Sequence, residues 1–198
     1  MSTTHSFAAL WLVPRLGRFH QACPQYQLRL DANPDAVDLL QDASVDVAIR
    51  YSRQRYPALH AACALPEWFG VYGSPAQVAR AGRRAPALVT VRWQDSELYG
   101  QGWQDWCGAA GLPAWRRPAT EHAYTEEHYA LQAAIAGQGL VLASSVMVSD
   151  SVAAGTLVPF RPQVRVEGSV YTALCAPGRE RHPPVRAFLA WLRKEFRA

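Results

Sequence analysis

Three polar residues of this 198-residue chain stand where a small anion could be bound. Ser6 and Asn33 each open an apolar pattern typical of a helix, and Arg50 ends a short apolar strand. The N–H groups at a helix start attract negative charge, and a guanidinium can hold a carboxylate through two hydrogen bonds. Helix starts and strand ends meet at one edge of a parallel α/β sheet. These residues therefore predict a site for a carboxylate or another small anion, with a structural salt bridge of Arg50 as the alternative.

The first element that positions this site is a helix near the start of the chain. Ser6 is expected to cap it, and Leu12, Leu16 and Phe19 fall on one helical face. Pro14 should lie in the first turns or kink them, because proline lacks an N–H group for the helical ladder.

The next elements should bring Asn33 and Arg50 to the same edge. Residues 26–30 alternate as a short strand, and Asn33-Pro34-Asp35 is typical of a helix start. The helix that follows should bury Val37 and Leu40, and residues 45–49 should form the next strand. A strand, a helix and a strand at this spacing predict a parallel, right-handed unit.

The rest of the chain alternates strands and helices, and two bridging stretches (66–73 and 162–171) separate an outer set of elements from an inner set. We therefore expect an α/β fold of two lobes, with lobe I at about 1–70 and 168–198 and lobe II at about 71–167. A cleft between two lobes is a common place for a small ligand. The remaining expected strands are 68–72, 87–93, 140–143, 157–160 and 171–175, and the expected helices are 75–81, 104–110, 126–136, 146–154 and 183–196.

Enzyme and metal motifs are absent from the sequence. It contains no G-x-S-x-G, no Walker A loop and no H-E-x-x-H. Gly137-Gln138-Gly139 fits the end of a helix better than a phosphate loop. We expect no catalytic residue, no cofactor and no metal site. A cluster of acids and histidines fits a solvated helix start, capped by Thr125, better than a metal site; it comprises Glu121, His122, Glu126, Glu127 and His128. The apolar face of this helix should include Tyr129, Ala133 and Ala136.

Composition excludes several classes of protein. With 49% hydrophobic and 18% charged residues, the chain can fold without disulfides, and no segment approaches the roughly 20 apolar residues that span a bilayer. No secretory signal is recognisable, so the four cysteines are expected to be buried thiols of a cytoplasmic protein. The formal net charge of +4 is mild, which gives weak support to nucleic-acid binding by this chain and none to membrane binding.

Several segments together resemble the effector-binding domain of LysR-type transcriptional regulators, especially the glycine-cleavage-activator-like branch. The resemblance spans nearly the whole chain in the family's order. Its segments are Ser6-Phe7-Ala8-Ala9, residues 12–19, Val45-Asp46-Val47-Ala48-Ile49-Arg50-Tyr51, Ser74-Pro75-Ala76, and residues 131–139, 153–160 and 185–192.

The resemblance implies a type II periplasmic-binding-protein-like fold, in which two Rossmann-like lobes are joined by two crossover strands. It implies a homodimer, with a tetramer in the full-length protein, and a small-molecule effector bound between the lobes. Binding to DNA would belong to the family's N-terminal winged helix-turn-helix, which is missing from these residues. The loop 52–55 lacks the glycines usual in the family. The effector contacts that the resemblance implies are Thr4, His5, Ser6, Asn33, Arg50, Tyr51, Tyr124 and Thr125.

These observations predict the ligand-sensing domain of a transcriptional regulator, with a small carboxylate or an amino acid as effector. One alternative is a stand-alone solute-binding protein of the same fold, which the missing export signal disfavours. Another is an enzyme on this scaffold, since fold alone does not fix function.

Overall fold

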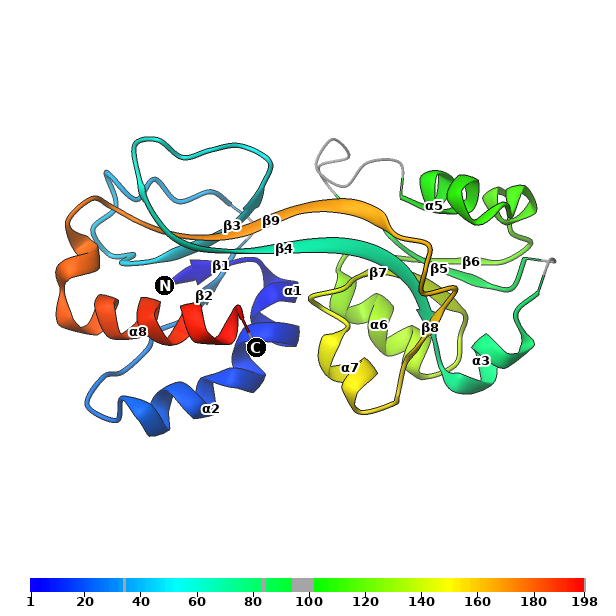
Figure 1. The fold of residues 1–198 in the computed structure, drawn as a ribbon, viewed down its shortest axis with the longest axis horizontal. Coiled ribbons are helices and arrows are strands. Elements are labelled where there is room, and N and C mark those ends of the chain that lie inside the picture. The colour runs from blue at the N-terminus through cyan, green and yellow to red at the C-terminus, as the bar shows by residue number, and fades with distance from the viewer. Residues whose placement is uncertain (34, 83–84, 94–101, 198) are drawn as a thin grey trace. The chain divides into compact units, whose positions relative to one another are not determined.

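A computed structural model describes residues 1–33, 35–82, 85–93 and 102–197 (Figure 1). The chain divides into two compact units: unit 1 comprises Met1–Pro66 and Ser169–Ala198, and unit 2 comprises Glu67–Gly168. Two long strands, β4 (His60–Gly73) and β9 (Val166–Cys175), each contribute residues to both units. Every helix in the described ranges is too short or too polar to cross a lipid bilayer.

The sheet of unit 1 contains three parallel strands, with the two-residue strand β1 in the middle. Its order is β2-β1-β3-β9, with β1 parallel to both β2 and β3, and β3 antiparallel to β9. β2 and β3 are parallel, as expected of the strands on either side of this segment, and β1 lies between them. The strand expected at 26–30 is wrong: the residues that pair with β1 are Asp31 and Ala32, just after that range. The bounds are β1 (Ser2–Thr3), β2 (Asp31–Ala32) and β3 (Ala48–Ser52).

The first helix follows β1 after a single extended residue, Thr4 (φ −72°, ψ 156°), which occupies the N-cap position. The expectation that Ser6 caps this helix is therefore wrong, since Ser6 lies inside the first turn and is buried. Pro14 lies in the turn after a π-helical segment, as its missing N–H group requires. The helix comprises α1 (His5–Phe7), the π-helical segment (Ala8–Leu12) and α2 (Val13–Ala22).

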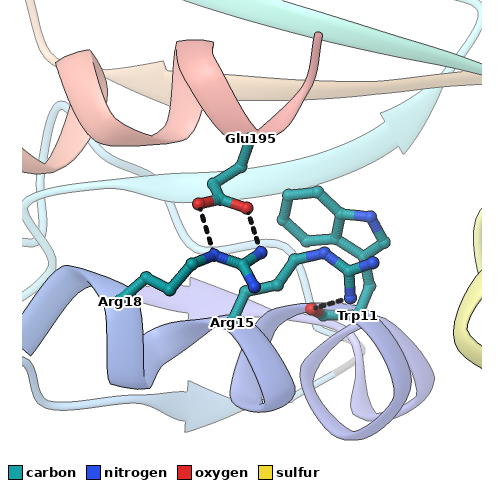
Figure 2. Close-up of polar contacts among 4 residues, drawn as sticks. All are labelled: Trp11, Arg15, Arg18 and Glu195. Atoms are coloured by element: carbon teal, nitrogen blue, oxygen red, sulfur yellow. Dashed lines mark hydrogen bonds and ion pairs between the residues drawn. The ribbon is translucent and has the colours of Figure 1, made fainter. Parts of the chain in front are cut away.

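The last helix, α8 (Pro183–Glu195), packs against this first helix within unit 1. Phe19 contacts Phe188 and Trp191, with ring centroids 5.4 Å apart in each pair. At the end of α8, Arg18 donates two hydrogen bonds to the carboxylate of Glu195, one of them 2.9 Å from Nε to Oε1 (Figure 2). Phe188 is buried in this contact.

Residues 35–43 form turns, and the helix that we expected after Asn33 is wrong. Three short side chains, those of Asn33, Asp38 and Asp42, each accept a backbone N–H two residues further on, at 2.9 Å. Such local bonds offer the backbone an alternative to the helical ladder. Pro34, on which part of the expectation rested, lies outside the described residues.

The apolar residues of this segment also differ from the expectation. Leu40 is 53% exposed and Val37 is only half-buried, whereas Leu39 is buried against Ala48 and Leu174. A single leucine therefore anchors the segment to the sheet of unit 1.

Unit 2 is built on a mixed sheet in the order β4-β7-β5-β6, and β8 pairs with the other edge of β4. β5 is parallel to β6 and β7, whereas β7 is antiparallel to β4. The expected strands 140–143 and 157–160 are confirmed to within one residue. The bounds are β5 (Leu88–Val91), β6 (Glu121–Tyr124), β7 (Leu140–Ser144) and β8 (Val158–Phe160).

Helices cover this sheet and complete its core. Trp106 and Trp115 are fully buried with Leu140 in one cluster, and the ring of Trp115 stacks on Phe160 with centroids 5.1 Å apart. The helices are α3 (Pro75–Arg80), α5 (Trp103–Ala110), α6 (Glu127–Ile135) and α7 (Ser149–Ala153), and single 3-10 turns lie at Pro113–Arg116 and, in unit 1, at Arg179–Arg181.

The start of α6 differs from the expectation in two respects. Glu126 occupies the N-cap position, so the prediction that Thr125 caps this helix is wrong. Tyr129 is 52% exposed, so it does not belong to the apolar face; Ala130 and Leu131 are buried there instead. Glu127, expected to be solvated, is buried.

Candidate functional site

The carboxyl ends of three parallel strands meet at one edge of the sheet in unit 1. Ser2 of β1 is paired with Asp31 of β2 and with Ala48 of β3. Two residues further along each strand direction stand Thr4, Asn33 and Arg50. Asn33 donates its backbone N–H to the carbonyl oxygen of Thr3 at 2.8 Å, which fixes this alignment. The structure therefore brings together three of the residues that the sequence singled out.

The guanidinium of Arg50 lies across this edge and is half-buried. Its Nη2 donates to the hydroxyl of Ser2 at 3.0 Å and to the carbonyl of Asp35 at 3.3 Å, and its Nη1 donates to the carbonyl of Ile49 at 3.4 Å. Within the described part of the chain these hydrogen-bond acceptors are neutral oxygens. The structural salt bridge considered as the alternative role of Arg50 is not among its described hydrogen bonds.

Burial lowers the pKa of Arg50, and the nearby Tyr56 and Asp31 oppose that shift. The cause is the loss of solvation of the positive charge, which neutral acceptors compensate only in part. A guanidinium offers five N–H donors, so its contacts leave capacity for a further acceptor. An anion placed at this edge would gain from the partly compensated positive charge of Arg50 and from the N–H donors that remain available.

His5 and Ser6 form the first turn of the helix beside Arg50. The carbonyl of Thr4 accepts the first intrahelical bond, from the N–H of Ala8 at 3.0 Å, and the side chain of Thr4 makes no capping hydrogen bond. Backbone N–H groups at a helix start carry partial positive charge. The helix start thus adds to the positive character of the edge where Arg50 lies.

Asn33 and Tyr51 are held by contacts within unit 1. The side chain of Asn33 accepts the N–H of Asp35, so Asn33 begins a turn rather than the expected helix. Tyr51 is buried, its hydroxyl accepts the N–H of Ser169 at 2.8 Å, and its ring contacts Tyr171 at 4.8 Å between centroids. These contacts make Tyr51 part of the core that supports Arg50.

The two expected site residues of the other half of the chain lie in unit 2, just before α6. The hydroxyl of Tyr124 donates to the side-chain oxygen of Gln138 at 2.9 Å, and Thr125 is exposed. Tyr124 is the last residue of β6, which is parallel to β5, and Thr125 follows it. They therefore lie beside the carboxyl edge of the sheet in their own unit.

Unit 2 also contains a hollow of about 480 Å³ between α5 and the sheet. Trp93, Trp103, Arg92 and Arg116 are among the residues that line it, and none of the eight expected site residues does. Within the described ranges no group of three or more His, Cys, Asp or Glu side chains is arranged to hold a metal ion.

Two buried acids of unit 2, Glu67 and Glu127, were missed by reasoning from the sequence. Each is only 5% exposed, and both are hydrogen-bonded to Ser144, the last residue of β7. Burial, together with the charge of Glu67, raises the pKa of Glu127 to about 8. The local pattern of charges at the start of α6 gives no sign of this burial, because the strands that cover Glu127 come from distant segments.

Comparison with known proteins defines the class to which this fold belongs. The fold matches the effector domain of the transcriptional regulator AmpR of Pseudomonas aeruginosa, with a TM-score of 0.71 and 23% identity over 99% of this chain and 93% of that one. It also matches the regulatory domain of CrgA from Neisseria meningitidis, with a TM-score of 0.75 and 19% identity over 98% of this chain and 96% of that one. The fold is thus the type II periplasmic-binding-protein-like fold of these regulatory domains.

The sequence matches the LysR substrate binding domain family over residues 1–197, and the chain belongs to this family. It is 31% identical over 197 residues to the glycine cleavage system transcriptional activator of Escherichia coli, covering 97% of this chain and 63% of that protein. It is 30% identical over 197 residues to the regulator TrpI of Pseudomonas aeruginosa, covering 96% of this chain and 65% of that protein. The chain therefore spans a little under two thirds of the length of these relatives.

These findings confirm the family resemblance and the expected fold class. The relatives are transcriptional regulators and not enzymes, which confirms the expectation that the chain is a ligand-binding regulatory domain without catalytic function.

Proposed function

We propose that this chain senses a small carboxylate or an amino acid and reports its presence within a transcriptional regulator. The carboxylate is bound at the edge of unit 1 by Arg50, Asn33 and the helix start at Thr4, His5 and Ser6. Tyr51 supports that edge, and Tyr124 and Thr125 are the proposed effector contacts of unit 2. The division into two ligand-binding lobes near residues 70 and 168 is part of the same proposal.

The observation that carries this proposal is the environment of Arg50. Its guanidinium is half-buried, its described acceptors are neutral oxygens, and it stands beside a helix start on three aligned strands. A carboxylate can form a bidentate, charge-assisted pair with such a group. A neutral sugar or an apolar ligand would add no negative charge to compensate the desolvated guanidinium.

The regulatory output belongs to a longer protein. Relatives of this chain are named as transcriptional regulators of which it spans part. We infer a cytoplasmic homodimer, tetrameric at full length, that contacts DNA through a domain outside these residues. The effector acts by binding one arrangement of the sensing domain more tightly than another, and only that difference in affinity can shift the equilibrium.

Thermal unfolding of the purified chain against amino acids and small carboxylates, each at about 1 mM, tests the proposal. A ligand with a dissociation constant near 10 µM stabilises the folded protein by about 2.7 kcal/mol. For a chain of this length that corresponds to a rise in melting temperature of about 5–10 °C. The expected result is such a rise with one carboxylate and none with its amide. A panel in which the amides stabilise as well as the acids would overturn the carboxylate assignment.

A further inference from the structure

Ser144 joins two buried acids that come from different elements of unit 2. Its backbone N–H donates to Oε1 of Glu127 at 2.7 Å, and its hydroxyl donates to Oε2 of Glu67. Glu67 belongs to β4, Ser144 ends β7 and Glu127 begins α6. One serine therefore links three elements through two carboxyl groups.

The directions of these hydrogen bonds follow from the remaining contacts of Ser144. Its Oγ accepts the N–H groups of Val146 at 3.1 Å and of Met147 at 3.3 Å, which occupy its two lone pairs. The hydroxyl proton is thus directed to Glu67. Ser144 donates to one oxygen of each carboxyl group, so a proton would be carried on the other oxygen of either group.

Two ionised carboxylates in so buried a position would be costly, because water cannot screen their repulsion. Burial and the charge of Glu67 raise the pKa of Glu127 to about 8; the N–H of Ser144 lowers it, and Glu126 raises it further. Tyr72 stays neutral over this range, because burial raises its pKa to about 12 although Arg165 lowers it. The guanidinium of Arg165 lies over the ring of Trp68, 4.1 Å from its centroid.

We propose that Glu67 and Glu127 hold one proton between them in folded unit 2, and that this proton is a pH-sensitive lock that fastens α6 and β7 to the middle of β4. Release of the proton places two negative charges on either side of Ser144. The hydrogen bonds that join the three elements then have to compete with this repulsion.

The packing around Glu67 prevents an easy escape from that repulsion. A Cβ atom on Gly168 would lie 2.6 Å from Cγ of Glu67, so the side chain runs directly over this glycine. The backbone beside it is fixed by two hydrogen bonds between Trp68 and Ser145, at 2.8 Å and 3.1 Å. Relief therefore requires water to enter or β4 to separate from its neighbours.

The direction of the pH dependence follows from a pKa that is higher in the folded chain than in the unfolded chain. The proton stabilises the folded state fully below the ordinary pKa of Glu127, 4.5, and this contribution is lost as the pH rises toward about 8. One proton of difference between the two states changes the folding equilibrium constant by about tenfold per pH unit.

Infrared spectroscopy of the folded chain tests for the proton directly, without a variant. The expected result is a C=O stretching band of a protonated carboxylic acid at pH 7, where ordinary glutamates are ionised, and its disappearance as the pH rises past about 8. The absence of that band from the folded wild-type chain at pH 6–7 would overturn the proposal.

Denaturant unfolding from pH 5 to 8 tests the lock. Five of the seven tryptophans lie in unit 2, so fluorescence reports mainly on that unit. Glu127→Gln keeps an acceptor for Ser144 and mimics the protonated acid. It should therefore abolish both the tenfold loss of the folding equilibrium constant per pH unit and the infrared band. The matched control Glu126→Gln, at the adjacent and less buried residue, should keep both. Equal pH dependence in wild type and Glu127→Gln would contradict the lock, and the ligand panel for unit 1 remains an independent test.

Discussion

Nη2 of Arg50 and Oγ of Ser2 lie 3.0 Å apart, although 48 residues separate them in the sequence. The contact joins β3 to the neighbouring strand β1 and holds the guanidinium against the sheet edge. Ser2 is fully buried, so the position of this hydroxyl is set by the core of unit 1. The orientation of the cation is therefore fixed before any ligand arrives, which lowers the entropic cost of binding.

Replacing Ser2 tests this positioning role. Ser2→Ala removes one hydrogen bond to Arg50 and leaves the charge, so we expect ligand affinity to fall by about 1 kcal/mol, or roughly fivefold. Titration calorimetry with the carboxylate found in the thermal panel measures it. The control is Ser52→Ala, at the end of β3, where the hydroxyl accepts the backbone N–H of Gln54. Equal losses in the two variants would argue against positioning by Ser2.

Two glycines of the chain should respond to alanine in opposite ways. A Cβ on Gly139 would lie 2.4 Å from the carbonyl oxygen of Ala87, which accepts the N–H of Leu140. Gly139→Ala should therefore destabilise the chain by about 1–3 kcal/mol. Gly17 lies in α2 with open space around it, so Gly17→Ala should stabilise by about 0.5–1 kcal/mol. Urea unfolding measures both, and a loss of stability in Gly17→Ala would contradict the open surroundings of that residue.

The pair formed by Arg18 and Glu195 predicts a contribution to stability that is lost at acidic pH (Figure 2). The hydrogen bonds from Arg18 lower the pKa of Glu195. Their stabilising effect is present above the ordinary pKa of a glutamate and is lost as the pH falls through the lowered value. Because Arg18 is largely exposed, we expect Arg18→Ala to cost less than about 1 kcal/mol at pH 6 and nothing measurable at pH 2–3.

The control for this pair is Arg186→Ala, which removes an exposed arginine from α8, the helix that contains Glu195. Thermal unfolding at the two pH values gives the comparison. A cost in Arg18→Ala that is the same at pH 3 and pH 6 would assign the effect to packing of the arginine stem against the helix.

Strong local signals predicted much of the fold. The final helix was correctly expected from Pro183-Pro184 and a regular apolar face, and α5 from an apolar pattern that ends at Gly111, where φ is +64°. β7 was expected from an uninterrupted apolar run, and each of its residues is buried. In these cases one segment contains the information for its own structure.

Errors had two causes: local side-chain hydrogen bonds that compete with the helical ladder, and contacts with other segments of the chain. After Asn33, side-chain bonds at Asp38 and Asp42 favour turns over the helix that the proline pattern indicated. The burial of Glu127 depends on β4 and β7, which are distant in sequence, so an acid at a helix start gave the wrong expectation of solvation. Arg50 could be identified as a candidate from the sequence, but its contacts with Ser2 and Asp35 could not.

The most direct test of the proposed function compares the affinity of the carboxylate ligand for the wild-type chain and for Arg50→Ala. If Arg50 pairs with the bound carboxylate, its removal should cost about 2–4 kcal/mol, a loss of roughly 30-fold to 1,000-fold in the binding constant. Arg53→Ala removes the same charge from an exposed residue three positions further on and should leave binding nearly unchanged. Wild-type affinity in a folded Arg50→Ala protein would contradict the account.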